Sequence, residues 1–219
     1  MIRDFGLIDV GYLMLAARWT LLLAAIAFVG GGIAGLLLTL LRVQPFAPLR
    51  WVASAWILVV QGTPLLAWLF VFYFGLALIG FPISTWLAVI AAYSLYASAY
   101  LAEIWRGALQ SIPRQQWEAG SALALGFLEQ LQHVIIPQAT RIAIPPTVGF
   151  LVQLIKNTSL AAVIGFVELT REGQLTNAST FKPFTVFIVV AAIYFAICFP
   201  LTQLSRNLEG RLHVARRVS

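Results

Sequence analysis

The sequence predicts an all-α polytopic membrane protein with five transmembrane helices, and three observations support this prediction. Hydrophobic residues make up 61% of the 219 residues and charged residues 10%, whereas a soluble domain carries about 25% charged residues. Five apolar segments each reach the length of about 20 residues that a helix needs to cross a bilayer. Most basic residues lie between and beyond these segments, as they do in membrane proteins.

The whole chain, residues 1–219, forms one predicted membrane domain. Its spans cover approximately 13–41, 51–79, 85–104, 142–167 and 184–204, and a long loop covers approximately 105–141. No segment alternates apolar and polar residues over about ten positions, which is the pattern of a membrane β-barrel strand. We therefore expect helices and no strands.

The first two spans contain residues that shape a helix. Gly31 and Gly35 lie four positions apart, a spacing that lets two membrane helices pack closely, although lining a pore is a second interpretation. In the second span, Gly62-Thr63-Pro64 predicts a kink, because proline lacks the N–H that a helix turn needs. The carbonyl that loses its donor requires another partner in lipid, such as Thr63 or a neighbouring helix.

The basic residues also predict an orientation. Nine of them lie on one side of the predicted bilayer and three on the other, so the nine-residue side is expected to be cytoplasmic. The N-terminus is then outside and the C-terminus inside, as five spans require. The nine are Arg42, Arg50, Arg106, Arg114, Arg141, Arg206, Arg211, Arg216 and Arg217, and the three are Arg3, Arg171 and Lys182.

Several classes of site are not predicted. The single cysteine excludes an intrachain disulfide, and two isolated histidines do not make a metal site. No Gly-x-x-x-x-Gly-Lys-Ser/Thr stretch is present, so the chain has no P-loop for ATP phosphates, and no nucleophile is paired with a base. The net charge of +6 does not gather on a soluble module, so nucleic acid is not an expected partner.

The loop after the third span is long for a simple turn. Pro113 suits the start of a helix, and from Trp117 small residues recur near one helical face. Small residues allow another surface to come close. The residues fit two interpretations equally: a surface that docks a partner, or a helix that only packs on its own bundle.

Four stretches resemble one family of transport proteins. Trp117-Glu118-Ala119-Gly120, followed by Val134-Ile135-Ile136-Pro137-Gln138-Ala139, resembles the EAA loop of ABC importer permeases. The other stretches are Gly62-Thr63-Pro64-Leu65-Leu66, Ala99 to Gly107, and Lys156-Asn157-Thr158-Ser159-Leu160. Together, and in this order, they resemble the MetI-like permeases for polar amino acids such as histidine, glutamine, arginine and glutamate.

The resemblance implies a permease subunit in the bacterial cytoplasmic (inner) membrane. Expected partners are two ABC ATPase subunits, a second permease subunit, an extracytoplasmic solute-binding protein, an amino acid substrate and membrane lipid. No cofactor is expected in this chain, because ATP and Mg would bind the separate ATPase. Contact with the ATPase is assigned to the loop residues Glu118, Ala119, Gly120, Ala124, Gly126 and Pro137.

The sequence departs from the family pattern at four positions. Gly120 replaces an alanine, and Ala124 occupies the usual glycine position, with a glycine at Gly126 instead. Either the loop bends two residues later than in relatives, or the local alignment shifts. Gln61 and Asn157 stand where relatives often have arginine and aspartate, which removes charge near the expected substrate path.

Candidates for that path or its gate come from the second and fourth spans. Lys156 is the charged residue deepest in an apolar segment, where a charge costs about 2.5–3.5 kcal/mol on insertion scales. It is expected either to contact a substrate carboxylate or gate, or to pair with Glu103, Glu168 or freed carbonyls. The remaining candidates are Gln61, Thr63, Asn157, Thr158, Ser159 and Glu168; satisfying the kink is the alternative role of Gln61 and Thr63.

Two other functions remain as alternatives. An ion-coupled secondary carrier needs ionisable groups near mid-membrane and usually a repeated architecture, and neither an acid at that depth nor a repeat is evident. In a channel or structural subunit, the long loop would need another purpose. Association with an ATPase distinguishes an importer from both.

Overall fold

The fold is entirely helical over the part of the chain described by a computed structural model, which covers the backbone of residues 3–218 and the side chains of residues 3–210. The predicted fold class is thereby confirmed. The α-helices are α1 (Leu7–Val43), α2 (Ala47–Gly62), α3 (Leu65–Phe70), α4 (Leu76–Leu78), α5 (Thr85–Gln110), α6 (Arg114–Ala122), α7 (Phe127–Gln130), α8 (Ile136–Asn157), α9 (Leu169–Thr180) and α10 (Pro183–Val218). Two π-helical turns, Val71–Gly75 and Leu131–Ile135, and a 3₁₀ helix, Thr158–Ile164, join some of them.

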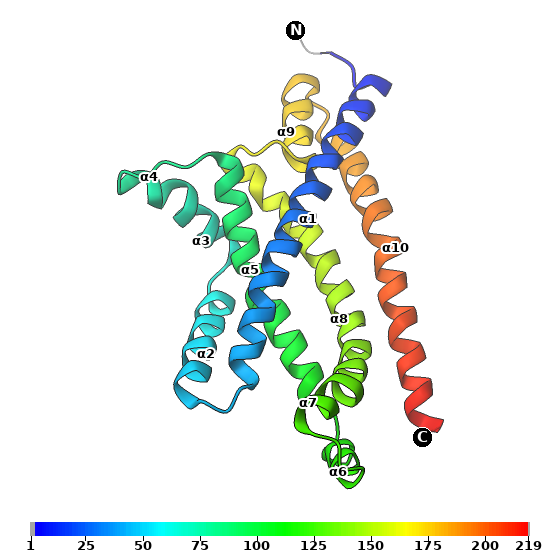
Figure 1. Ribbon diagram of the computed structural model, residues 1–219. Coiled ribbons are helices and arrows are strands. Elements are labelled where there is room, and N and C mark those ends of the chain that lie inside the picture. The colour runs from blue at the N-terminus through cyan, green and yellow to red at the C-terminus, as the bar shows by residue number, and fades with distance from the viewer. Residues whose placement is uncertain (1–2, 219) are drawn as a thin grey trace.

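Four long helical stretches within the described chain are apolar enough to cross a membrane: Leu7–Val43, Thr85–Gln110, Phe127–Ile164 and Pro183–Gly210. A fifth span exists if α2 and the helical stretch Leu65–Leu78 count as one, but these two are bent by 97° relative to each other. The predicted segment 51–79 is therefore not a straight helix, and α3 and α4 run sideways away from α2 (Figure 1). The other spans extend beyond most of the predicted limits.

Pro64 explains the break in the second span. It has no N–H, so the carbonyl four residues earlier, that of Val60, has no helical donor. Thr63 is extended at φ −111° and ψ 130°, and its hydroxyl donates to the carbonyl of Val59 at 2.8 Å. Thr63 thus satisfies a backbone group beside the break, which is one of the two roles expected for it.

Helices α1 and α5 share an extensive interface, and glycines make their close approach possible. A Cβ added at Gly31 would overlap the side chain of Ala97, and one at Gly35 would lie 3.0 Å from the carbonyl oxygen of Ser98. The close packing expected of these glycines is therefore present. Thr39 on α1 also donates to the carbonyl of Ala102 on α5 at 3.3 Å.

The two ends of the bundle differ. The N-terminus and α9 lie at one end, and α6, α7 and the C-terminus lie at the other (Figure 1). We call the latter the loop end. Arg211, Arg216 and Arg217, which entered the predicted orientation, have side chains beyond the described ones. Chain ends on opposite sides agree with an odd number of spans.

The α1–α5 contact leads to a testable prediction. Gly31→Ala should destabilise the protein by about 1–3 kcal/mol, because the added methyl group meets Ala97 in a packed interface. Gly32→Ala is the matched control, since a Cβ there lies an ordinary 3.7 Å from Trp105. Thermal unfolding in detergent should show a lower midpoint for the first variant alone. Equal midpoints for both variants would contradict this account of the interface.

Candidate functional site

The loop at the loop end folds back on itself through α6 and α7. Helix α6 follows Pro113, as predicted, and the rings of Trp117 and Phe127 stack with centroids 5.7 Å apart. The inner side of the loop is closed by buried Ile112, Ile135 and Ala139, against which Trp117 also packs. One side of the loop therefore packs on its own bundle, and only the other side is free to meet a partner.

Gly120 belongs to the inner side. It is buried, and a Cβ at this position would lie 2.8 Å from Cγ of Gln130. The Gln130 amide donates to the carbonyl of Leu125 at 2.8 Å and to the hydroxyl of Ser121 at 3.1 Å. Gly120 thus leaves room for the side chain that closes the loop. The sequence offered no signal for Gln130.

The chain reverses at Ala124, which adopts a left-handed conformation with φ +58°. The N–H of Leu125 donates to the carbonyl of Gly120 at 3.1 Å, and that of Ala124 to the carbonyl of Ser121 at 2.9 Å. These two bonds form a Schellman motif, whose left-handed position favours glycine. Gly126 has φ −66° and is the N-cap residue that precedes α7. The loop therefore bends at the usual glycine position and not two residues later.

The outer side of the loop is apolar at its tip. Leu123, Phe127 and Leu128 are 75%, 67% and 73% exposed, and we call these three residues the loop tip. Glu118 and Ala119 are exposed beside them, and Pro137 is exposed at the start of α8. Large apolar side chains exposed on one short loop are a common mark of a protein interaction site.

A cavity of about 350 Å³ lies at the break between α2 and α3. It brings together three of the predicted path residues, Gln61, Thr63 and Asn157. The Gln61 amide donates to the carbonyl of Ala99 on α5 at 3.3 Å. The full lining is Gln61, Gly62, Thr63, Pro64, Leu65, Tyr96, Tyr100, Gln153, Asn157 and Leu160.

Three polar members of this lining were missed from the sequence. Tyr96 and Tyr100 come from α5 and Gln153 comes from α8. The two tyrosine rings lie 4.5 Å apart, and that of Tyr100 stacks on Phe150 at 5.5 Å. The spacing of Tyr96 and Tyr100 by four residues places them on one helical face, but nothing in the sequence indicated that this face lines the cavity.

Lys156 and Ser159 lie elsewhere. They line a separate groove of about 560 Å³ between α8 and α10, together with Tyr194, Cys198 and Arg206 among others. Lys156 is exposed and forms no ion pair within residues 3–210. The pairing with Glu103 or Glu168 proposed as one interpretation is therefore not found. Adjacent residues on a helix point about 100° apart, which separates Lys156 from Asn157.

Thr158 and Glu168 line neither space. The buried Thr158 hydroxyl donates to the carbonyl of Ile155 at 2.7 Å. Glu168 is fully buried and caps the N-terminus of α9, accepting the N–H groups of Thr170 at 3.0 Å and Arg171 at 2.9 Å. Its carboxylate also accepts the hydroxyl of Tyr194 at 2.8 Å. These contacts join α9 to α10, and burial raises the pKa of the Glu168 carboxyl above its ordinary value.

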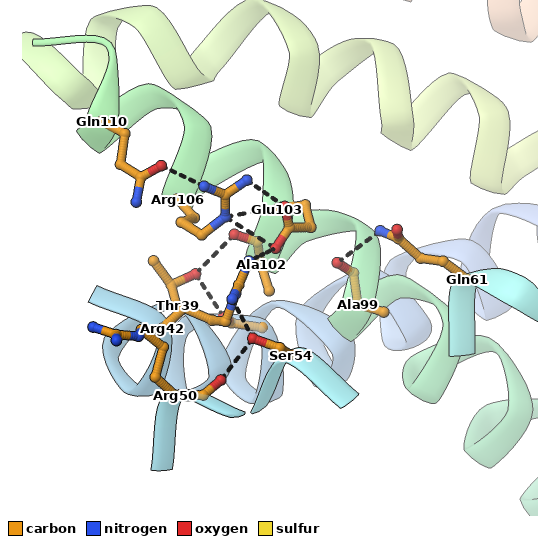
Figure 2. Close-up of polar contacts among 11 residues, drawn as sticks. Thr39, Arg42, Arg50, Ser54, Gln61, Ala99, Ala102, Glu103, Arg106 and Gln110 are labelled. Carbon is orange, nitrogen blue, oxygen red and sulfur yellow. Dashed lines mark hydrogen bonds and ion pairs between the residues drawn. The ribbon is translucent and has the colours of Figure 1, made fainter. Parts of the chain in front are cut away.

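An ionic network ties α1, α2 and α5 together toward the loop end. Figure 2 shows Glu103 between two arginines: Arg106 on the same helix at 3.0 Å and Arg42 on α1 at 3.3 Å. Arg42 also donates to Ser54 on α2. Glu103 is one helical turn from Ala99, the acceptor of Gln61 (Figure 2). The network therefore anchors the same part of α5 that forms a wall of the cavity.

Residues 27–214 match the model of the family described as binding-protein-dependent transport system inner membrane component. This chain belongs to that family. The match covers the second half of α1, all of the later membrane spans, the loop and the cavity.

Individual relatives agree with the family match. The chain is 38% identical to the probable amino-acid ABC transporter permease protein YckA of Bacillus subtilis (strain 168), covering 91% of this chain and 88% of that one. It is 36% identical to the glutamine transport system permease protein GlnP of Escherichia coli (strain K12), covering 90% and 91%. The structure is similar to that of an amino acid ABC transporter crystallised with histidines, with a TM-score of 0.88, 33% identity, and coverage of 96% and 100%.

Ala124 supports a prediction about the loop of this family member. Ala124→Gly should stabilise the turn by about 0.5–1 kcal/mol. Removing the Cβ relieves the strain of a left-handed alanine, and this gain exceeds the extra conformational entropy that a glycine loses on folding. Ala122→Gly is the control: Ala122 lies within α6, where glycine costs up to about 1 kcal/mol. Hydrogen exchange of the amides of residues 120–130 should slow in the first variant and speed up in the second. Faster exchange in both would contradict the proposed turn geometry.

Proposed function

We propose that this chain is the membrane-spanning permease subunit of an ATP-driven importer for a polar amino acid. The observation that carries the proposal is the loop tip, an exposed apolar surface on an otherwise closed loop at one end of a membrane bundle. The relatives named as amino acid permeases support the substrate class. In an ion-coupled carrier or a channel, such a surface would need another purpose.

The assembly we propose contains two permease subunits, two ATPase subunits and an extracytoplasmic binding protein. ATP and Mg would bind the ATPase subunits, since this chain carries no P-loop. The loop end would face the cytoplasm, with the N-terminus and α9 outside, in agreement with the charge asymmetry of the sequence. The N-terminus and α9 are then on the same side of the membrane as the binding protein.

The loop tip is proposed to seat on the ATPase. Leu123, Phe127 and Leu128 would enter an apolar groove, with Glu118 and Ala119 at its edge. Gly120 and Ala124 act indirectly, because they set the shape of the loop rather than present a surface. Closure of the ATPase pair would then move the loop as one body and bias the bundle between two states.

The substrate path is proposed to include the cavity at the break in the second span. In secondary transporters, discontinuous helices commonly form the substrate site, because their free backbone groups are accessible there. Gln61, Thr63 and Asn157 would contact the substrate. We do not assign Thr158 or Glu168 to this role, because their side chains bond to backbone and to Tyr194 inside the protein.

Docking through the loop can be tested with an exposed residue. Ala119→Trp should abolish co-purification with the ATPase and lower ATP-dependent amino acid uptake at least about tenfold, the effect of roughly 1.4 kcal/mol, because the added ring blocks close approach. Gly120 is unsuitable for this test, because a large residue there would displace Gln130 and disrupt the loop itself.

Ala178→Trp is the matched control, because Ala178 is exposed on α9 at the opposite end of the bundle. This variant should keep the ATPase bound. Uptake is measured in liposomes containing ATP, with the binding protein and a panel of amino acids outside. Retained ATPase binding and uptake in Ala119→Trp would overturn the docking surface, and uptake by the permease without any ATPase would overturn the proposed function.

A further inference from the structure

The cavity at the break between α2 and α3 is polar but carries no charged side chain among the residues that line it. Its six polar side chains are three carboxamides and three hydroxyls: Gln61, Gln153, Asn157, Thr63, Tyr96 and Tyr100. The nearest charged residue along the chain, Lys156, lines the separate groove against α10. The cavity volume of about 350 Å³ is at the small end of the range for ligand pockets.

We infer that this cavity takes an amino acid whose side chain is polar and uncharged, and that Gln61 and Asn157 determine this selectivity. The inference rests on the proposed function, and it names the substrate class of that same site. The α-ammonium and α-carboxylate groups are common to every amino acid and offset each other. The charge of the side chain is therefore what the lining discriminates.

The chemistry of the lining carries the inference. A carboxamide both donates and accepts hydrogen bonds, as does a hydroxyl. The six groups can therefore pair with both the donors and the acceptors of an amide or hydroxyl side chain. A guanidinium, ammonium or carboxylate would bring a net charge into a space without a counter-charge. Removing an ionised group from water without a partner costs far more than removing a neutral one that is hydrogen-bonded.

Neighbouring contacts keep the lining in place. One Gln61 N–H is held by the carbonyl of Ala99 at 3.3 Å, which directs that side chain along α5. The backbone carbonyl of Asn157 accepts the hydroxyl of Tyr93 at 2.7 Å, so the end of α8 is fixed against the same helix. Gln61 is thus held through its side-chain amide and Asn157 through its backbone carbonyl, and both contacts come from α5.

The test measures binding to the permease–ATPase complex in lipid nanodiscs without the binding protein, so that the selectivity of that protein does not enter. The probes are radiolabelled glutamine, arginine and glutamate. The wild type should bind glutamine at least about tenfold more tightly than the other two, a difference equal to about 1.4 kcal/mol. Asn157→Asp should shift the arginine-to-glutamine ratio toward arginine by about tenfold or more, because it supplies a counter-charge to the guanidinium.

Two further variants complete the design. Gln61→Arg should shift the ratio of glutamate to glutamine affinity in favour of glutamate, because it supplies a counter-charge to the carboxylate. If Asn157→Asp does not assemble, this variant alone tests the inference. Gln203→Glu is the matched control, since it makes the same amide-to-acid change in the groove against α10, and it should leave both ratios unchanged. Size-exclusion chromatography and ATPase content establish that each variant is assembled.

Four outcomes overturn the inference. They are tighter or equal binding of arginine or glutamate by the wild type, unchanged ratios in assembled Asn157→Asp and Gln61→Arg, a shift in Gln203→Glu like that in Asn157→Asp, and no binding of any probe. The proposed function is judged separately by ATP-dependent uptake with the binding protein present. If ATP-dependent uptake occurs without these binding preferences, Gln61 and Asn157 do not determine selectivity, and the proposed transport function of the chain is unaffected.

Discussion

The absence of one backbone N–H, that of Pro64, is the constraint on which the site depends. In an apolar environment each unpaired carbonyl is costly, so the chain can break only where other groups supply donors or where the space is polar. Thr63 bonds back to Val59, and the neighbouring backbone opens into a cavity lined by amides and hydroxyls. The helix direction changes by 97°, which brings residues from α2, α3, α5 and the end of α8 to one place. A continuous helix would bury this region against its neighbours.

A break of this kind requires rigid surroundings, and α5 provides them. On one side, small residues let α1 approach its backbone so closely that an added methyl group would collide. On the other side, α2 bonds to its carbonyl at Ala99. Glu103 then links the end of α1 to the middle of α2 through Arg42. Because Glu103 is only partly exposed, this network is screened less than a surface ion pair. The wall of the cavity and the base of the loop are therefore held by one helix.

Much of the architecture could be predicted from the sequence, because hydropathy and charge placement follow directly from the solvent in which the chain folds. The spans, the loop and the kink at Pro64 depend on composition and on covalent chemistry. The direction in which side chains point depends on packing. Adjacent Lys156 and Asn157 therefore face different spaces, which no local pattern indicated.

The loop illustrates the same limit. Gly120 looked like a contact surface, yet it is the residue that accommodates Gln130. Gln130 itself was missed, because its partners, Leu125 and Ser121, become neighbours only after the chain reverses. The stacking of Trp117 on Phe127 likewise forms across that reversal. Such contacts are tertiary, even though they span only about ten positions.

The left-handed alanine has a consequence for which substitutions the loop can accept. Ala124 is exposed, and exposure normally means that most side chains fit. Here the restriction comes from stereochemistry rather than from space. Glycine and asparagine suit this backbone region, whereas β-branched residues are strongly disfavoured in it. Among members of the family, this surface position should therefore accept as few residue types as a position in the core, although its side chain is exposed.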